Sequence, residues 1–153
     1  MRERVQQFIV DRMIERPSSK LTLAEQASML QRGGDRIDRR LAAVADTPAN
    51  RAVISHIIGI ERWGQQRLLV LAGEPFARDE YDAYAFSPAL PLSDLRGHFA
   101  TTRRGTVALV NILALAGVSP SRTVPHNDFG DLTLRGWLRY LGVHAEIESR
   151  KLR

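Results

Sequence analysis

Four long segments of the chain carry apolar and small residues at alternating intervals of three and four residues. That spacing places the side chains on one face of an α-helix, with a stripe available for burial. The pattern predicts helices over residues 21–45, 49–72, 94–117 and 132–150. No comparable segment alternates every two residues, as a half-exposed strand would. The sequence therefore predicts an all-α fold, and four amphipathic helices of this length favour a four-helix bundle.

The segments outside these helices contain prolines and glycines, which break regular structure. Residues 2–15 have a shorter helical pattern that Pro17 is expected to end, so residues 1–17 are predicted to form a short extra N-terminal helix. Residues 73–92 are rich in aromatic residues and prolines and are long for a connector. We expect this crossover loop to lie over one end or side of the bundle, held there by its aromatic side chains.

Glycines inside one predicted helix and short polar residues at the start of two others predict local features of the fold. Gly33 and Gly34 interrupt the first predicted helix, where each glycine costs roughly 1 kcal/mol relative to alanine. A kink or the close approach of a neighbouring helix would explain their presence. Ser93 and Asp131 are expected to cap the third and fourth helices, because short polar side chains accept hydrogen bonds from first-turn amides.

The composition excludes several classes of protein. A chain of 153 residues has room for one domain, which we place at residues 1–153. It contains no cysteine, which excludes disulfides, thiolate nucleophiles and cysteine-ligated metals. Without a secretory apolar region or an apolar run of about 18 residues, we expect a cytoplasmic protein with no membrane partner. The 22 basic residues are dispersed among 17 acidic ones, so we expect no nucleic-acid partner.

The last predicted helix carries two polar side chains on its apolar face. His144 and Glu148 are four residues apart, so both leave the side of the helix that Leu141 marks as buried. A buried carboxylate must pair, take up a proton or bind a metal. His56 lies on or beside the apolar stripe of the second predicted helix. Two imidazoles and one carboxylate from facing helices would suit divalent zinc, iron or nickel.

The same residues also have simpler interpretations. His144 could bond to a backbone carbonyl or to Tyr140, and Glu148 could be solvated near the end of its helix. His56 alone would more often be a half-buried histidine with a hydrogen-bond partner than a metal ligand. Tyr140, one turn before His144, could donate a hydrogen bond to a metal-bound group or could pack as an aromatic ring.

Other polar residues are interpreted as structural. His126 belongs to a turn before the last helix, where turn and capping chemistry is expected. His98 has neither an acid nor a histidine one turn later. Glu61 lies too far around its helix to share the ligand face of the histidine before it. We expect Glu61 to form a surface pair with Arg62 or Gln65.

Two stretches of the chain resemble the DinB-like superfamily, whose YfiT-type members are four-helix-bundle, metal-dependent enzymes. These stretches are SHIIGIERW at residues 55–63 and PHNDFGDLTLRGWLRYLGVHAEIE at residues 125–148. The resemblance covers about residues 21–150 and is diffuse outside these two stretches. It implies His56 and His144 as the first two metal ligands. It places Glu148 where the family has a third histidine, and glutamate can either ligate a divalent metal or leave the site degenerate.

The resemblance implies an activity and leaves an alternative. The family includes S-transferases and isomerases that use a low-molecular-weight thiol. A metal-dependent thiol S-transferase or hydrolase is therefore implied, with a small-molecule substrate or thiol as partner and Tyr140 as the candidate catalytic residue. Tyr81 and Tyr84 of the long loop are the aromatics expected to cover such a site. The alternative is a non-enzymatic stress-related or scaffold bundle with a degenerate site, and a homodimer is compatible with both.

Overall fold

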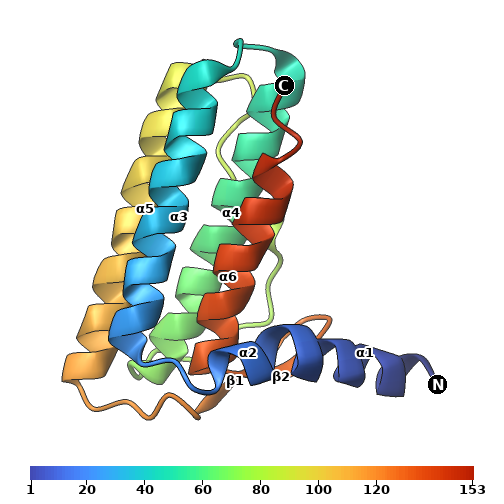
Figure 1. Cartoon of the computed structure of the whole chain (residues 1–153), viewed down its shortest axis with the longest axis vertical. Helices are drawn as coiled ribbons and strands as arrows, with labels where there is room; N and C mark the ends of the chain where they lie inside the picture. The colour runs from blue at the N-terminus through green and yellow to red at the C-terminus, as the bar shows by residue number, and fades with distance from the viewer.

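Helices make up most of the protein. The computed structural model describes residues 1–153, and 69% of them are helical. The four long helices are α3 (Leu23–Ala43), α4 (Pro48–Leu71), α5 (Leu92–Leu115) and α6 (Leu134–Ser149). They run side by side (Figure 1), and each begins and ends within two residues of its predicted bounds. The prediction of a mainly helical protein is therefore confirmed. No helix is long and apolar enough to cross a lipid bilayer.

Threonine side chains begin three of the long helices. At the start of α3, the Thr22 hydroxyl accepts a hydrogen bond from the Glu25 amide, and the Glu25 carboxylate accepts one from the Thr22 amide. Thr47 caps α4 and Thr133 caps α6, each by accepting a hydrogen bond from the amide three residues later. These bonds satisfy amides that have no helical partner, which fixes where each helix starts.

The predicted caps at Ser93 and Asp131 are wrong. Helix α5 begins at Leu92, directly after Pro91, and the Leu92 amide donates to Asp46 in the α3–α4 connection. The amide is thus satisfied by a residue distant in sequence, which local pattern cannot reveal. Asp131 lies in a strand two residues before the true cap of α6.

The long helices pack in pairs. Helix α3 contacts α5 and α6, and α4 contacts the same two helices, so α3 and α4 lie diagonally opposite each other. Near the start of both helices, Gln26 of α3 donates to the Arg135 carbonyl of α6. Near their ends, Arg40 of α3 bonds to Glu146 of α6. Helices α3 and α6 therefore run in the same direction.

Two glycines allow unusually close contacts between helices. A Cβ atom at Gly34 would lie 2.8 Å from Cγ of Arg103, which projects from α5. A Cβ atom at Gly64 would lie 2.5 Å from Cδ2 of Leu141, which projects from α6. Real Cβ atoms do not approach this closely, so any larger residue would push the helices apart. The close approach predicted at Gly33 and Gly34 is therefore confirmed, at Gly34.

The apolar core forms two clusters along the helices. The larger one includes Leu30, Trp63, Leu68, Leu109, Leu113 and Trp137. The smaller one includes Ile37, Ile54, Ile57, Ile58, Leu95 and Phe99. On α4 and α5, the positions between the two clusters are taken by buried Glu61 and Arg103. A polar layer therefore separates the two apolar parts of the core.

The N-terminal segment forms one continuous helix, made of α1 (Arg2–Val10), a π-helical turn η1 (Asp11–Glu15) and α2 (Arg16–Ser18). It crosses one end of the long helices and projects beyond them (Figure 1). The extra helix predicted over residues 1–17 is present and extends one residue further, to Ser18, so that Pro17 lies within its last turn. Proline has no amide hydrogen for the Met13 carbonyl four residues earlier. Arg139 of α6 supplies that hydrogen bond instead, at 2.7 Å.

A small β-hairpin precedes α6, and the sequence pattern missed it. Strand β1 (Thr123–His126) pairs with β2 (Gly130–Thr133) in antiparallel register, with Val124 opposite Leu132. Gly130 has a φ of +73°, a left-handed conformation that suits glycine after the turn. Each strand has only four residues and contributes few inward side chains, so two-residue alternation is too short to detect.

Candidate metal centre

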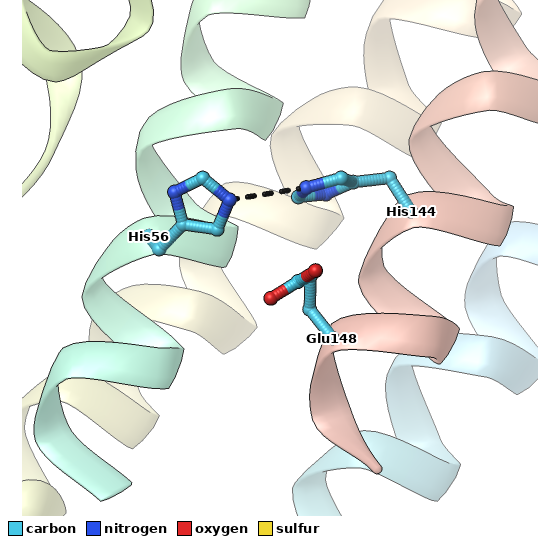
Figure 2. Close-up of side chains that lie close together, drawn as sticks. All are labelled: His56, His144 and Glu148. Atoms are coloured by element: carbon cyan, nitrogen blue, oxygen red, sulfur yellow. Dashed lines mark hydrogen bonds between the residues drawn. The ribbon is translucent and has the colours of Figure 1, made fainter. Parts of the chain in front are cut away.

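His56 of α4 and the pair His144 and Glu148 of α6 lie together where these two helices meet (Figure 2). The Nε2 atoms of the two imidazoles are 3.2 Å apart. One ligand atom from each of the three residues lies within 4.8 Å of the other two, and all three side chains are partly buried. The structure thus brings together the three residues that the sequence singled out.

The packing of α4 against α6 explains why they meet. His144 and Glu148 are one turn apart on α6, so both side chains face α4. The close contact between Gly64 and Leu141 draws the two helices together. The helices run in opposite directions, because Leu141 meets Gly64 whereas the later His144 meets the earlier His56.

The spacing of the two imidazoles fits a shared metal ion. In a tetrahedral zinc site with Zn–N distances of about 2.0–2.1 Å, two ligand nitrogens are about 3.3 Å apart. The observed 3.2 Å between the Nε2 atoms of His56 and His144 matches that edge. The same distance is also a hydrogen bond between one protonated and one unprotonated nitrogen. The donor set itself, two nitrogens and one carboxylate oxygen, suits zinc, nickel or iron.

The protonation of these groups favours cation binding. Burial lowers the pKa of His144 to about 4, and the neighbouring His56 adds to that shift. His144 is therefore neutral near pH 7, and neutral imidazole is the form that ligates metals. A hydrogen bond from Lys151 lowers the pKa of Glu148, which keeps the carboxylate ionised. The bond from Lys151 Nζ to Glu148 Oε2 is 2.7 Å long, so a metal would share this carboxylate with a lysine.

Tyr140 lies next to the three residues without belonging to the donor set. Its ring centroid is 5.8 Å from that of His144, and its hydroxyl forms no hydrogen bond within the protein. Burial raises the pKa of Tyr140 to about 12, so the phenol stays protonated and can donate a hydrogen bond. The sequence indicated that Tyr140 lies one turn before His144, but it could not indicate that the Tyr140 hydroxyl lacks a hydrogen-bond partner.

The long loop covers the outer side of α4. Its residues 73–91, which we name the strap, include a short 3₁₀ helix, η2 (Tyr81–Tyr84). The ring of Tyr81 packs edge-on against His56 with centroids 5.1 Å apart. Arg62 of α4 donates to the Tyr84 carbonyl, and Ser55 donates to the Phe86 carbonyl. The structure therefore shows a loop lying over the side of the helices, and it places Tyr81 against a candidate ligand.

Asp79 is the main anchor of the strap, and sequence reasoning missed it. The Trp63 indole donates to the Asp79 carbonyl at 3.1 Å, and Asn127 of the hairpin donates to the same carbonyl at 2.8 Å. The Tyr84 hydroxyl donates to the Asp79 carboxylate. Buried Arg67 approaches that carboxylate at 3.4 Å. The expectation that the loop is held by its aromatic side chains is incomplete, because Asp79 gathers hydrogen bonds at both its carbonyl and its carboxylate.

The interpretation of Glu61 as a surface residue is wrong. Its side chain is 2% exposed and accepts two hydrogen bonds from the Arg103 guanidinium, at 2.7 and 2.9 Å. Thr106 donates to the same carboxylate at 2.7 Å, and Arg103 also donates to the Leu30 carbonyl. This buried ion pair joins α4, α5 and α3. A signal was present in the sequence, since Glu61 follows Ile57 by one helical turn on the apolar stripe.

The other two histidines lie outside the donor set. His126 is 4% exposed, and its Nδ1 accepts hydrogen bonds from the amides of Asp128 and Phe129. Those two bonds place the ring proton on Nε2, which has no partner. His126 thus has the predicted turn role, and burial lowers its pKa to about 4. His98 stacks on Phe86 with ring centroids 3.9 Å apart.

Comparison with known proteins adds no relative to this picture. No family model matches the chain, and no curated protein matches its sequence.

Proposed function

We propose that this chain is a DinB-like four-helix bundle that binds a divalent metal through His56, His144 and Glu148. The convergence of the three ligand atoms within 4.8 Å carries the proposal. Two further observations support it, namely the 3.2 Å separation of the imidazole nitrogens and the ionised state of the carboxylate. The pairing of α3 and α4 with both α5 and α6 supports the bundle arrangement.

The proposed activity is that of a metal-dependent thiol S-transferase or hydrolase acting on a small molecule. A bound divalent metal supplies positive charge that lowers the pKa of a thiol or a water. The protein's own groups would hold and orient the reacting molecule. Tyr140 offers a neutral phenol as a hydrogen-bond donor, and Tyr81 of the strap restricts access to His56.

Metal binding is tested on protein purified without a polyhistidine tag. We expect elemental analysis and competition with a fluorescent zinc chelator to show one divalent ion per chain. His56→Ala, His144→Ala and Glu148→Ala should each weaken binding sharply, because each removes one ligand. Glu148→His should keep the site in the family's three-histidine form.

His98→Ala is the matched control, because it removes a half-buried histidine that is not in the donor set. It should leave zinc affinity unchanged. Wild-type protein that stays metal-free under excess Zn²⁺, Ni²⁺ and anaerobic Fe²⁺ would overturn the proposal.

The reaction is tested separately with a low-molecular-weight thiol and a chromogenic aryl chloride. In that transfer a carbon–sulfur bond forms, chloride leaves and the thiol loses its proton. Metal-loaded protein should accelerate product formation, and Tyr140→Phe should lower the rate without releasing the metal. Full metal loading with no acceleration of this transfer, or of ester and amide hydrolysis, would refute the enzymatic part alone.

The second candidate is a non-enzymatic bundle with a degenerate site. A specific observation favours it: each of the three residues has a hydrogen-bond partner without a metal, since His56 bonds to His144 and Glu148 bonds to Lys151. This candidate predicts no zinc binding and no loss of stability on chelation. It retains the proposed stress-related or scaffold role, for which a homodimer would be detected by sedimentation analysis.

A further inference from the structure

A groove of about 520 Å³ lies between α3 and α6, and none of its lining residues belongs to the candidate metal centre. Its base is apolar, with Leu30 and Leu138 almost fully buried and Val143 beside them. The exposed side chains of Met29 and Ile147 extend this apolar surface outward. The volume lies within the range of about 300–1,000 Å³ that small-molecule sites occupy.

The charges around the groove are strongly unbalanced. Its basic lining residues are Arg32, Arg36, Arg103, Arg139 and Arg150. Glu146 is the only acidic residue of the lining, and it lies 2.7 Å from Arg40 at the edge of the groove. Arg36 and Arg150 approach Glu146 only at 3.7 and 3.9 Å. One carboxylate therefore faces three guanidinium groups, and the groove keeps an excess of positive charge.

Three of the arginines are free to bind an anion. Arg103 is saturated by buried partners, and Arg139 donates its Nε–H to a backbone carbonyl of the N-terminal helix. Arg32 forms no ion pair or hydrogen bond, and Arg36 and Arg150 have only the distant contact to Glu146. Arg32 and Arg36 are one turn apart on α3, while Arg150 belongs to α6. A ligand between the helices would meet cationic side chains from both walls.

Two glycines keep the groove open although helix packing does not require them. A Cβ atom at Gly142 would lie 3.5 Å from Cδ2 of Leu30, and one at Gly33 would lie 3.5 Å from Nη1 of Arg103. Both are ordinary contacts, unlike the 2.8 Å contact that excludes a side chain at Gly34. Glycine within a helix costs about 1 kcal/mol relative to alanine. At these two positions the glycines preserve space in the groove.

We propose that this groove binds a free, single-chain organic anion, with its apolar chain on the base and its acidic group at Arg32, Arg36 and Arg150. The apolar base selects for the chain, because burial of each CH₂ group is favourable by about 0.8 kcal/mol. The guanidinium groups select for a carboxylate or phosphate, which they bind through paired N–H donors. The proposal is independent of metal binding, because it uses a different face of α6.

Isothermal titration calorimetry with laurate tests the proposal on the full chain. We expect one laurate per chain, with at least tenfold weaker binding in the double variant Arg32→Gln/Arg36→Gln. Gly33→Ala/Gly142→Ala should also weaken binding at least threefold while raising the thermal unfolding midpoint, because methyl groups fill the base and favour the helices. Arg104→Gln/Arg122→Gln is the matched control, since it removes the same charge from outside the groove and should leave binding unchanged.

Other probes distinguish the groove from non-specific adsorption. Inorganic phosphate should bind at least tenfold more weakly than laurate, and equal binding would refute the role of the apolar base. Dodecyltrimethylammonium should also bind at least tenfold more weakly, and equal binding would refute charge selection. Phe8→Ser alters the exposed apolar side of α1 and should leave laurate affinity unchanged. Loss of binding in that variant, or retention of binding in both groove variants, would overturn the proposal.

Discussion

Two polar clusters contain a glutamate inside the helical part of this protein, and they differ in how completely they are bonded. The Glu61 carboxylate is 2% exposed and accepts hydrogen bonds from both Arg103 and Thr106. The Glu148 carboxylate is 19% exposed and bonds to one surface lysine. The neighbouring side chains of His56 and His144 form a hydrogen bond to each other and none to Glu148.

The comparison separates a structural polar cluster from one that can bind a ligand. At Glu61 both carboxylate oxygens accept hydrogen bonds from buried protein donors, and the positive charge of Arg103 already balances the carboxylate. At Glu148 the candidate ligand atoms converge, Oε1 of the carboxylate accepts no hydrogen bond, and the side chains retain access to solvent. Burial of a carboxylate is therefore a poor guide to function, whereas the balance of donors and acceptors around it is informative.

We call Glu61, Arg103 and Thr106 the closed cluster, and His56, His144 and Glu148 the open cluster. The largest effect on stability is expected from breaking the closed cluster. Arg103→Met leaves the Glu61 carboxylate buried without its partner, which should lower the free energy of unfolding by about 3–5 kcal/mol. Urea denaturation measures the change. The double variant Glu61→Leu/Arg103→Met replaces the pair with apolar groups and should be more stable than Arg103→Met. A double variant that is less stable than the single one would show that the ion pair is not the main interaction at this position.

Lowering the pH should destabilise the protein through His126, which is buried, has no ion-pair partner and lies outside the donor set. The folded-state pKa of His126 is lowered to about 4 from an unfolded value of 6.5. Below pH 6.5 the unfolded chain takes up a proton that the folded protein does not, so stability falls with pH down to about 4. The free energy of unfolding should fall by about 3 kcal/mol through this residue. His126→Gln should show a shallower decline in urea midpoint between pH 7 and 4, and an identical slope would contradict the assignment.

Zinc should stabilise the open cluster and not the closed one. At a free concentration of 100 times the dissociation constant, Zn²⁺ should raise the free energy of unfolding by about 2.7 kcal/mol. His56→Ala should lose that increase and should change the metal-free stability by less than about 1 kcal/mol, because its side chain is only partly buried. His98→Ala should keep the full increase. Equal stabilisation of wild type and His56→Ala would place zinc at another site.

The smallest effect concerns the lysine that competes for the open cluster. Lys151→Ala removes an exposed pair with Glu148, which should cost about 0.2–1 kcal/mol or less in stability. Zinc affinity should rise about twofold to fivefold, because the carboxylate no longer has to leave the lysine. Lys20→Ala, a change at the other lysine of the chain, is the control. Reduced zinc affinity in Lys151→Ala would show that the lysine supports the site instead of competing for it.

The sequence predicted the convergence of His56, His144 and Glu148 better than it predicted the residues around them. His144 and Glu148 share a face because of helix periodicity alone, and His56 lies on the inner side of α4 for the same reason. The burial of Glu61 could have been inferred from its place one turn after Ile57, but its partner Arg103 could not, because it lies on a different helix. Asp79 likewise depends on Trp63 and Asn127, which come from other elements. The hairpin before α6 was missed because two strands of four residues carry too little alternation.

What the sequence by itself determined are the features that repeat within one element: the four long helices and their inner faces. Only the tertiary structure decided which faces meet. The diagonal placement of α3 and α4 puts the candidate metal centre between α4 and α6 and the arginine-rich groove between α3 and α6. The physical reason is that periodicity is a property of neighbouring residues, whereas a metal site, an ion pair or a groove needs side chains from separate elements at a defined distance.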